Sequence, residues 1–316
     1  METIPILSIV TPTRGNFSPY WLEQLLRVEG SVQFVLIYPP QTAPRSINDP
    51  RIKTLVSPYK GEVVQRFTGL INATGKYVLA LDDDDFVHPQ VVSLVTDYFQ
   101  TFPDSWVLRL MMKKVDYTDQ ENIYKPWSQL PIIDKHTIAN PQLTNSPEQT
   151  LRTLPIAPLT NRFNFKQMFL PYQDRKDMHG AHIENFNNKV WKNDLVQQAL
   201  TDLSQTMKLI GALTWMPFWS LDRLLGLYIQ ALFFQENSTV GHWMSAPEQI
   251  RYIVKSQESK QEFRLILPAD ILLIKRFSQY GYFWNLGWEQ FWVAVRKIAS
   301  YYKQMVQIKL TMAKSE

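Results

Sequence analysis

The chain has 316 residues, of which 45% are hydrophobic, so it is long enough for one large domain with an appendage or for two modest domains. Its 33 lysine and arginine residues against 29 acidic ones give a net charge of +4, and no basic run is interleaved with aromatic residues, so nucleic acid is not an expected partner. The absence of cysteine excludes disulfides, a thiolate nucleophile and a thiolate metal site.

The first part of the chain alternates short apolar runs with helical patterns. The opening run, residues 4–10, lacks the basic region and cleavage site of a signal peptide, so we expect a strand and a cytoplasmic protein. A helix should follow, with Ser18 as its N-cap and Pro19 as its first residue. The next elements are a strand at 32–38, a strand at 52–56, a helix at 61–74 and a strand from Tyr77. This order predicts an α/β fold with a mostly parallel sheet flanked by helices.

Four consecutive aspartates, residues 82–85, follow the strand that begins at Tyr77. That strand is apolar throughout, which is typical of a strand buried on both faces of a parallel sheet. Ligands of open α/β sheets bind at the carboxyl ends of the strands, so these acids are well placed for chemistry. A divalent cation would relieve their mutual repulsion. The alternative interpretation is an acidic surface turn before the helix that begins at Pro89.

The middle of the chain is less regular. A helix after Pro89 and a strand at 106–112 are followed by a segment rich in Pro, Asn, Gln and Thr, residues 118–180. Loops of this length in a compact domain are usually functional, and the aromatic residues in the segment need something to pack against. We therefore expect a functional loop, with a disordered insertion as the alternative. A helical pattern resumes at 183–207.

Residues 209–316 predict a helical C-terminal extension. The apolar stretch at 209–235 is interrupted by Asp222 and Arg223, so neither half reaches the roughly 20 apolar residues of a membrane-spanning helix. The segment 284–310 is amphipathic, basic and rich in aromatic residues. Such a helix packs on the core or on another subunit, or it lies on an anionic bilayer surface. We expect no transmembrane span, while a homo-oligomer and peripheral contact with the inner membrane face stay open.

The segment GEVVQRFTGLINATGKYVLALDDDDFVHP, residues 61–89, resembles the nucleotide-sugar half of family 2 glycosyltransferases, which have the GT-A fold. The resemblance covers roughly the first hundred residues in order and spacing, and its separate parts are fairly specific only together. These parts are the segment TPTRGN after the first strand, Arg66, Gly69, Gly75 and Tyr77 in and after the helix, and Asp82 and Asp84 as the Asp-x-Asp motif.

The resemblance implies a metal-dependent, inverting transfer from a nucleotide-sugar. Mn²⁺ or Mg²⁺ on the diphosphate would stabilise the charge of the leaving group, and such hard cations prefer carboxylate oxygens. We expect Asp84 to be the principal metal ligand and Asp82 and Asp85 to be further ligands. Asp82 and Asp83 would also contact the ribose or metal-bound water. The other residues expected at the nucleotide-sugar are Thr11, Pro12, Thr13, Arg14 and Arg66, the last with a solvated helix-face arginine as the alternative.

An inverting transfer also needs a carboxylate that takes the proton of the acceptor hydroxyl. In the family this base lies in a Glu-Asp pair that begins a helix, and HIENFNNKVW places Glu184 there, with Asn185 in place of the usual aspartate. Asp174 and Asp177 are alternative bases. Three histidines are further candidates for the site: His179 and His182 near Glu184, and His242 near the metal or the diphosphate.

Two departures from the family pattern concern the nucleobase. Tyr38, Pro39 and Pro40 stand where the family usually has an aspartate that contacts the base. Phe67 replaces the asparagine that commonly follows the helix arginine. A UDP-sugar is the expected donor by resemblance, and guanosine or deoxythymidine donors stay open.

The predicted function is transfer of a sugar to a hydroxyl acceptor such as a glycan or a lipid-linked glycan. We expect a GT-A catalytic domain over 1–208, with a nucleotide-sugar half at 1–105 and an acceptor-side half at 106–208, before the extension at 209–316. Two alternatives remain. A sugar nucleotidyltransferase would need a Gly-rich phosphate loop, and TPTRGN offers only Gly15. A catalytically inactive homologue would bind a glycan or a partner through its aromatic loops.

Overall fold

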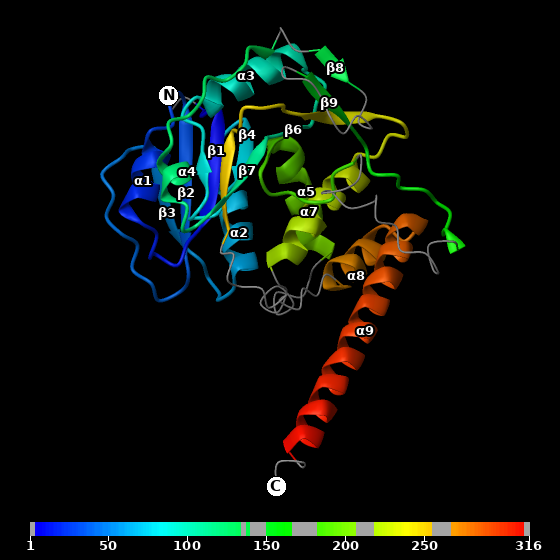
Figure 1. Ribbon diagram of the computed structural model, residues 1–316. Coiled ribbons are helices and arrows are strands. Elements are labelled where there is room, and N and C mark those ends of the chain that lie inside the picture. The colour runs from blue at the N-terminus through cyan, green and yellow to red at the C-terminus, as the bar shows by residue number, and fades with distance from the viewer. Residues whose placement is uncertain are drawn as a thin grey trace.

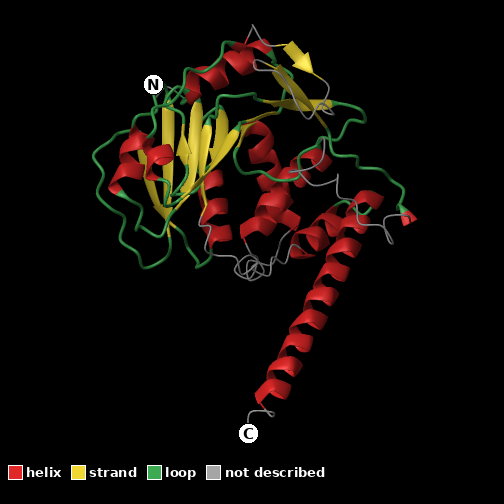
Figure 2. Ribbon diagram, in the orientation of Figure 1, coloured by secondary structure: helices red, strands yellow, loops and turns green. Residues whose placement is uncertain are grey.

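The computed structural model describes residues 4–133, 137–139, 150–165, 182–206, 218–254 and 267–312. A large sheet runs through the body, with helices on both of its faces (Figure 2). The last helix extends away from this body (Figure 1). The predicted α/β class, with a mostly parallel sheet flanked by helices, is confirmed. The expected C-terminal extension is helical only in part, because Thr239–Trp243 and Ile250–Val254 are strands of the two sheets.

One half of the nine-stranded sheet is fully parallel. Its strands are, in spatial order, β3 (Ile52–Val56), β2 (Val32–Tyr38), β1 (Leu7–Pro12) and β4 (Tyr77–Ala80). Strands β1 and β4 are buried along their whole length, as expected for strands covered by helices on both sides. Because the four strands run in one direction, their carboxyl ends meet at one edge of the sheet, and the aspartates of residues 82–85 follow β4 at that edge.

The other half of the sheet is mixed. A short strand, β10 (Lys189–Lys192), lies antiparallel between β4 and β6 (Val107–Arg109). Beyond β6 the order continues with β11 (Thr239–Trp243), β9 (Thr150–Pro155) and β8 (Thr137–Ala139). A separate three-stranded sheet contains β5 (Phe86–Val87), β12 (Ile250–Val254) and β7 (Met112–Asp116).

The helices cover the two faces of the large sheet. On one face the core contains side chains of α1 (Pro19–Leu26) and α3 (Val91–Thr101). On the other face it contains side chains of α2 (Glu62–Ile71), α5 (Asn193–Thr206) and α7 (Phe218–Leu232). A short α4 (Gln120–Tyr124) follows β7, while α8 (Leu267–Arg276) packs between α7 and α9 (Gly281–Met312).

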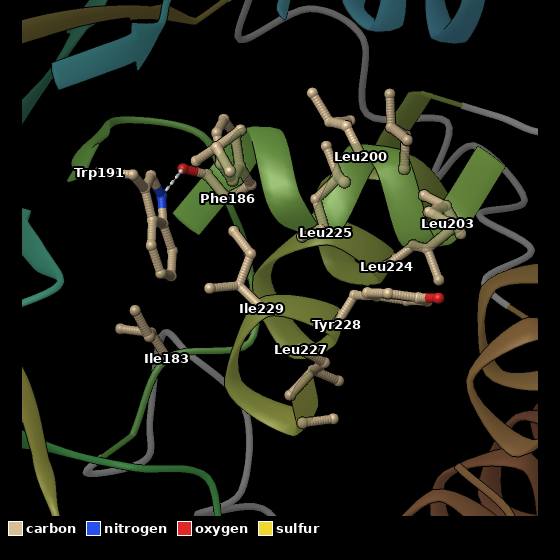
Figure 3. Packing of buried hydrophobic residues seen from close by; sticks show 14 of the residues in the cluster. Ile183, Phe186, Trp191, Leu200, Leu203, Leu224, Leu225, Leu227, Tyr228 and Ile229 are labelled. Carbon is tan, nitrogen blue, oxygen red and sulfur yellow. Dashed lines mark hydrogen bonds between the residues drawn. The ribbon is translucent and has the colours of Figure 1, made fainter. Parts of the chain in front are cut away.

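The second of these cores joins the sheet to the C-terminal helices. Leucines of α5 and α7 interdigitate there, and the rings of Phe186 and Trp191 stack with centroids 5.4 Å apart (Figure 3). The Trp191 indole N–H donates to the Phe186 carbonyl at 3.0 Å, so the buried polar group is satisfied. Each fully buried leucine or aromatic side chain contributes about 2–3 kcal/mol to stability. This core therefore anchors α7 firmly to the sheet.

Gly69 lets α2 lie unusually close to the sheet. A Cβ atom at this position would lie 2.4 Å from Ile37 Cδ1 and 2.5 Å from Val10 Cγ1, so there is no room for a side chain. The close contact fixes the height of α2 above β1 and β2. It thereby positions Gln65 and Arg66, on the same helix, at the carboxyl edge of the sheet.

Two predicted elements differ from the structure. The helix expected at 183–207 begins only at Asn193, because residues 189–192 form β10 and bury Val190 and Trp191 between two strands. The strand expected at 106–112 is divided between β6 and β7, which belong to different sheets. The described parts of the segment 118–180 contain α4, β8 and β9, so the segment includes regular structure.

The long helix α9 starts on the body and leaves it (Figure 1). Its first turn buries Tyr282 and Phe283, whereas Phe291 and Trp292 are exposed. Within the described ranges, none of the helices combines the length and the hydrophobicity that crossing a bilayer requires.

Candidate active site

A pocket of about 970 Å³ lies at the carboxyl edge of the parallel strands. The loops after β1 and β4, the start of α2, and residues of α1 and α4 line it. Its volume falls within the range of roughly 300–1,000 Å³ that small-molecule sites occupy. The pocket contains three of the four aspartates and three residues of the β1 loop: Asp82, Asp83, Asp84, Pro12, Thr13 and Arg14.

The aspartates that line the pocket are not equivalent. Asp83 accepts a hydrogen bond from the Thr13 hydroxyl at 2.6 Å, and the same hydroxyl oxygen accepts from the Gly15 amide at 2.9 Å. This chain of bonds ties the β4 end to the β1 loop. Asp84 is exposed at the pocket, and Asp82 is half-buried beside Arg66. Asp83 and Asp84 therefore offer carboxylate oxygens to the pocket in different surroundings.

Asp85 points away from the pocket. Its side chain is buried, its Oδ1 accepts from the Ile253 amide at 2.9 Å, and its Oδ2 has no hydrogen-bond partner. Burial raises the pKa of Asp85 well above the ordinary value, and the neighbouring Asp82 and Asp84 raise it further. Its backbone carbonyl accepts from the Trp21 indole at 2.9 Å. Asp85 thus fixes the loop from beneath, and the structure does not place it as a metal ligand in the pocket.

Arg66 is the hub of a buried polar network beside the pocket. Its guanidinium forms an ion pair with Asp82, donates to Glu62 Oε1 at 3.1 Å and donates to Asn187 Oδ1 at 2.9 Å. Burial alone would lower the pKa of Arg66, but Asp82 and Glu62 raise it above the ordinary value. Arg66 does not line the pocket, so the structure places it behind Asp82 and not against a nucleotide.

Gln65, on the neighbouring position of α2, was missed by sequence reasoning. Its side-chain amide donates to the carbonyls of Thr13 at 3.0 Å and of Ile37 at 2.7 Å. It therefore holds together the ends of two strands at the pocket. A glutamine inside an amphipathic helix gives no sequence signal for this role, because the two carbonyls come from distant segments.

An aromatic wall closes the side of the pocket next to α1 and α4. Tyr20 packs edge-on against Tyr124 at 4.3 Å between ring centroids and lies 5.6 Å from the ring of Phe86. Phe17 and Trp21 continue this wall, with centroids 5.0 Å apart. The sequence does not indicate this wall, because the convergence of these aromatic residues depends on the fold.

Glu184 lies outside the pocket lining, in a buried cluster shared with the C-terminal helices. Its Oε1 accepts from the Tyr282 hydroxyl at 2.8 Å, and its Oε2 lies 3.9 Å from Arg223 Nε. Arg223 Nε is also 3.3 Å from Asp270 Oδ1. Burial alone would raise the pKa of Glu184, but Arg223, His182 and Tyr282 bring it down to about 2.

Helix α7 lies so close to the Glu184 backbone that only glycine fits at the point of contact. A Cβ atom on Gly226 would lie 2.4 Å from the Glu184 carbonyl oxygen. The Asn187 amide donates to the Asp222 side chain at 2.5 Å, so the segment 184–187 is held along α7.

The remaining predicted residues are placed as follows. Thr11 is fully buried below the pocket. His182 donates toward the Tyr282 hydroxyl at 3.0 Å and so belongs to the Glu184 cluster. His242 bonds to the Tyr98 hydroxyl at 2.9 Å, and burial lowers its pKa to about 4, so it is a neutral core residue away from the pocket. Asp174, Asp177 and His179 lie outside the described residues.

The comparison with protein families matches residues 40–170 to glycosyl transferase family 2. This region is a family 2 glycosyltransferase domain. The match includes α2, β4 and the four aspartates, on which the prediction depended, whereas the TPTRGN segment lies before the matched residues. The predictions of the family and of a glycosyltransferase are confirmed.

The structure is similar to that of S. aureus TarS. Similarity to TarS 1–349 with UDP has a TM-score of 0.46 and 11% identity, covering 85% of this chain and 65% of that chain. For TarS itself the TM-score is 0.44 and the identity 12%, and the alignment covers 85% of this chain and 39% of that chain. For TarS 1–349 with UDP-GlcNAc the TM-score is 0.43 and the identity 11%, and the alignment covers 85% of this chain and 66% of that chain. The chain thus spans less than two thirds of the length of each of these three chains. A comparison with curated protein sequences found no match.

The donor set of the family 2 domain suits a hard divalent cation. In the described residues no three histidine or acidic side chains converge on one point. Mg²⁺ is commonly held by one or two carboxylates together with substrate phosphates and water, and not by an all-protein cage. Asp83 and Asp84, with Asp82 beside them, fit that requirement.

Replacing Arg66 by Met should destabilise the fold by about 3–5 kcal/mol, because Asp82 and Glu62 would be left close together without a cation. Urea denaturation of the two proteins measures this. The matched control is Arg27→Met, which breaks an exposed i,i+4 pair with Glu23 and should cost less than about 1 kcal/mol. Equal stability of Arg66→Met and the parent chain would contradict the claim that Arg66 stabilises the fold through Asp82 and Glu62.

Glu184 should make unfolding pH-dependent at low pH. Its folded-state pKa of about 2 is below the ordinary 4.5, so it stabilises the fold above pH 4.5, and this contribution is lost as the pH falls toward 2. The contribution corresponds to about 3 kcal/mol at neutral pH. Glu184→Gln should reduce the slope of the unfolding free energy against pH in this window. An unchanged slope would show that Glu184 is not paired in solution.

Proposed function

We propose that this glycosyltransferase transfers a sugar, with inversion, from a UDP-sugar to a hydroxyl of a glycan or a lipid-linked glycan. The observation that carries the proposal is the pocket at the carboxyl edge, where the Asp-x-Asp residues and the β1 loop face the same space. Family membership supports the reaction class, and the pocket volume suits a nucleotide-sugar.

In this proposal Asp84 binds a divalent cation, with Asp83 or Asp82 supplying a further oxygen. When bound, Mn²⁺ or Mg²⁺ neutralises the charge that develops on the diphosphate leaving group. Thr13 orients Asp83 through its hydroxyl, and Arg66 holds the Asp82 carboxylate in place. We no longer assign Asp85 to the metal, because its carboxyl is buried against Ile253.

The nucleotide is proposed to lie on the β1 loop. Pro12, Thr13 and Arg14 line the pocket, and Gln65 holds the loop in place through the Thr13 carbonyl. The Arg14 guanidinium can complement a phosphate charge. Glu62 also lines the pocket, so it joins the residues proposed to contact the donor. Thr11 and Arg66 act from behind this surface and do not contact the donor in this proposal.

Glu184 stays our candidate for the base, with Asp174 and Asp177 as alternatives. A carboxylate with a pKa of about 2 takes up a proton poorly, because its ionised form is held by Arg223 and Tyr282. Glu184 can therefore act as the base only when acceptor binding separates it from these partners. Transfer assays on Glu184→Gln, Asp174→Asn and Asp177→Asn would identify the base as the carboxylate whose loss abolishes kcat.

Replacing Asp84 by Asn should lower kcat/KM at least about 100-fold and weaken metal-dependent UDP binding, because the principal metal ligand is lost. The measurements are transfer and hydrolysis with a nucleotide-sugar panel, and calorimetry of UDP with and without Mn²⁺. Asp104→Asn, at an exposed turn, is the matched control and should leave both unchanged.

These measurements also distinguish the alternatives. Metal-dependent UDP binding without transfer to any acceptor would favour a binding homologue. Formation of a nucleotide-sugar from a nucleoside triphosphate and a sugar 1-phosphate would favour a nucleotidyltransferase. Full activity of Asp84→Asn would overturn the metal assignment.

We also propose that α9 brings the enzyme to an anionic membrane surface. Its outer part exposes Phe291, Trp292 and Tyr302, the last with 64% of its surface accessible. Between 290 and 312 the helix carries four basic residues and no acidic residue. A helix with an aromatic face and a positive charge excess binds at the boundary of anionic bilayers. This location would also suit a lipid-linked acceptor.

Cosedimentation with vesicles tests the proposal about α9. The full chain should bind vesicles rich in phosphatidylglycerol and not vesicles of phosphatidylcholine alone. The double substitution Phe291→Ser and Trp292→Ser should lower the bound fraction several-fold, whereas Tyr59→Ser, at an exposed aromatic residue elsewhere, should not. Equal binding of the double variant, or self-association through α9 measured by light scattering without vesicle binding, would contradict membrane docking.

A further inference from the structure

A row of three cationic side chains and one tryptophan crosses the mixed half of the sheet. The pairing aligns Lys189 of β10 with Arg109 of β6, Arg109 with Trp243 of β11, and Trp243 with Arg152 of β9. Because aligned residues of neighbouring strands point to the same face, these four side chains stand side by side. We name this set the cationic row.

The two arginines hold the tryptophan between them. The Arg109 guanidinium carbon lies 3.9 Å from the centre of the Trp243 ring, and that of Arg152 lies 3.7 Å from it. Since β6 and β9 flank β11 on opposite sides, the cations approach the indole from both sides. Cation–π attraction lets two like charges lie this close together.

The charge of the cationic row is not balanced at its Arg152 end. Within the described part of the chain, no carboxylate forms an ion pair with Arg152, and burial together with Arg109 lowers its pKa. The Trp243 indole N–H is buried and has no hydrogen-bond partner. Lys189 and Arg109 are themselves buried. An acceptor-rich anion would satisfy the indole N–H and reduce the repulsion between the arginines.

The location of the cationic row separates it from the donor pocket. None of its residues lines that pocket. Lys189 lies on β10, next to β4, and the other three residues lie on the strands beyond β10. Arg109, Arg152 and Lys189 belong to the part of the chain expected to bind the acceptor, residues 106–208, whereas Trp243 comes from the C-terminal part. The residues two positions along from Arg109 and Arg152, Val107 and Leu154, belong to the core under α5 and α7, so the row faces that side.

We propose that the cationic row is an anion subsite that binds a phosphate group of the acceptor. The inference rests on the proposed function, because it takes the phosphate to be part of the sugar acceptor and not of the nucleotide-sugar donor. Phosphate fits best because it carries nearly two negative charges and three acceptor oxygens, which arginine binds in bidentate geometry. The enzyme would then select phosphorylated acceptors over neutral ones.

Titration of the full ¹⁵N-labelled chain with inorganic phosphate tests the subsite through the indole resonance of Trp243, identified with Trp243→Phe. We expect a saturable shift of this resonance. Arg152→Gln should weaken the phosphate affinity about tenfold. Arg152→Lys, which keeps the charge, should retain part of it. Arg27→Gln, at an exposed arginine, should leave it unchanged.

Three results would overturn the proposal: no shift, a shift that is equally strong in Arg152→Gln, or displacement of the phosphate by UDP with Mg²⁺. The last result would assign the row to the donor. Failure of UDP to bind at all, with the phosphate shift intact, would count against the proposed transferase function and not against the anion subsite. Thermal denaturation of Arg152→Gln confirms that the variant is folded when its affinity is measured.

Discussion

The ion pair between Arg66 and Asp82 is the interaction on which the arrangement of the site depends. It joins α2 to the end of β4, and its third arm reaches Asn187, on the segment that leads into β10. The pair is tolerable in a buried position only because Glu62 and Asn187 complete the hydrogen bonds of the guanidinium. Together with the shared hydrophobic core, this network joins the parallel half of the sheet to the mixed half.

Much of the parallel half of the sheet and of the pocket at its edge could be predicted from the sequence, because the signals there are local. Strand β4 and the aspartates after it are contiguous, and parallel strands bring the TPTRGN loop to the same edge. The different roles of the four aspartates could not be predicted. They depend on Thr13, Arg66 and the Ile253 amide, which lie 70, 16 and 168 residues from their partners.

The mixed half of the sheet was harder to predict because its elements are short and paired across long sequence separations. Residues 189–192 continue a helical pattern in the sequence, yet they form an antiparallel strand that completes the sheet between β4 and β6. The alignment of Lys189, Arg109, Trp243 and Arg152 follows from that insertion. The environment of Glu184 likewise arises from residues of three C-terminal helices, which no local motif indicates.

The contact at Gly226 has a consequence for how the chain could move. Gly226 leaves no room for a side chain beside the Glu184 carbonyl, and the Asn187 amide donates to Asp222, so a shift of the segment 184–187 would be coupled to α7. Helix α7 packs on α8, and α8 packs on α9. If Glu184 is the base, a shift of α7 relative to α9 would separate it from Tyr282 of α9 but not from Arg223, which lies on α7 itself. Binding of another surface to α9 would then alter the hydrogen bond between Tyr282 and Glu184. In this way an interaction outside the catalytic body would control when Glu184 can take up a proton.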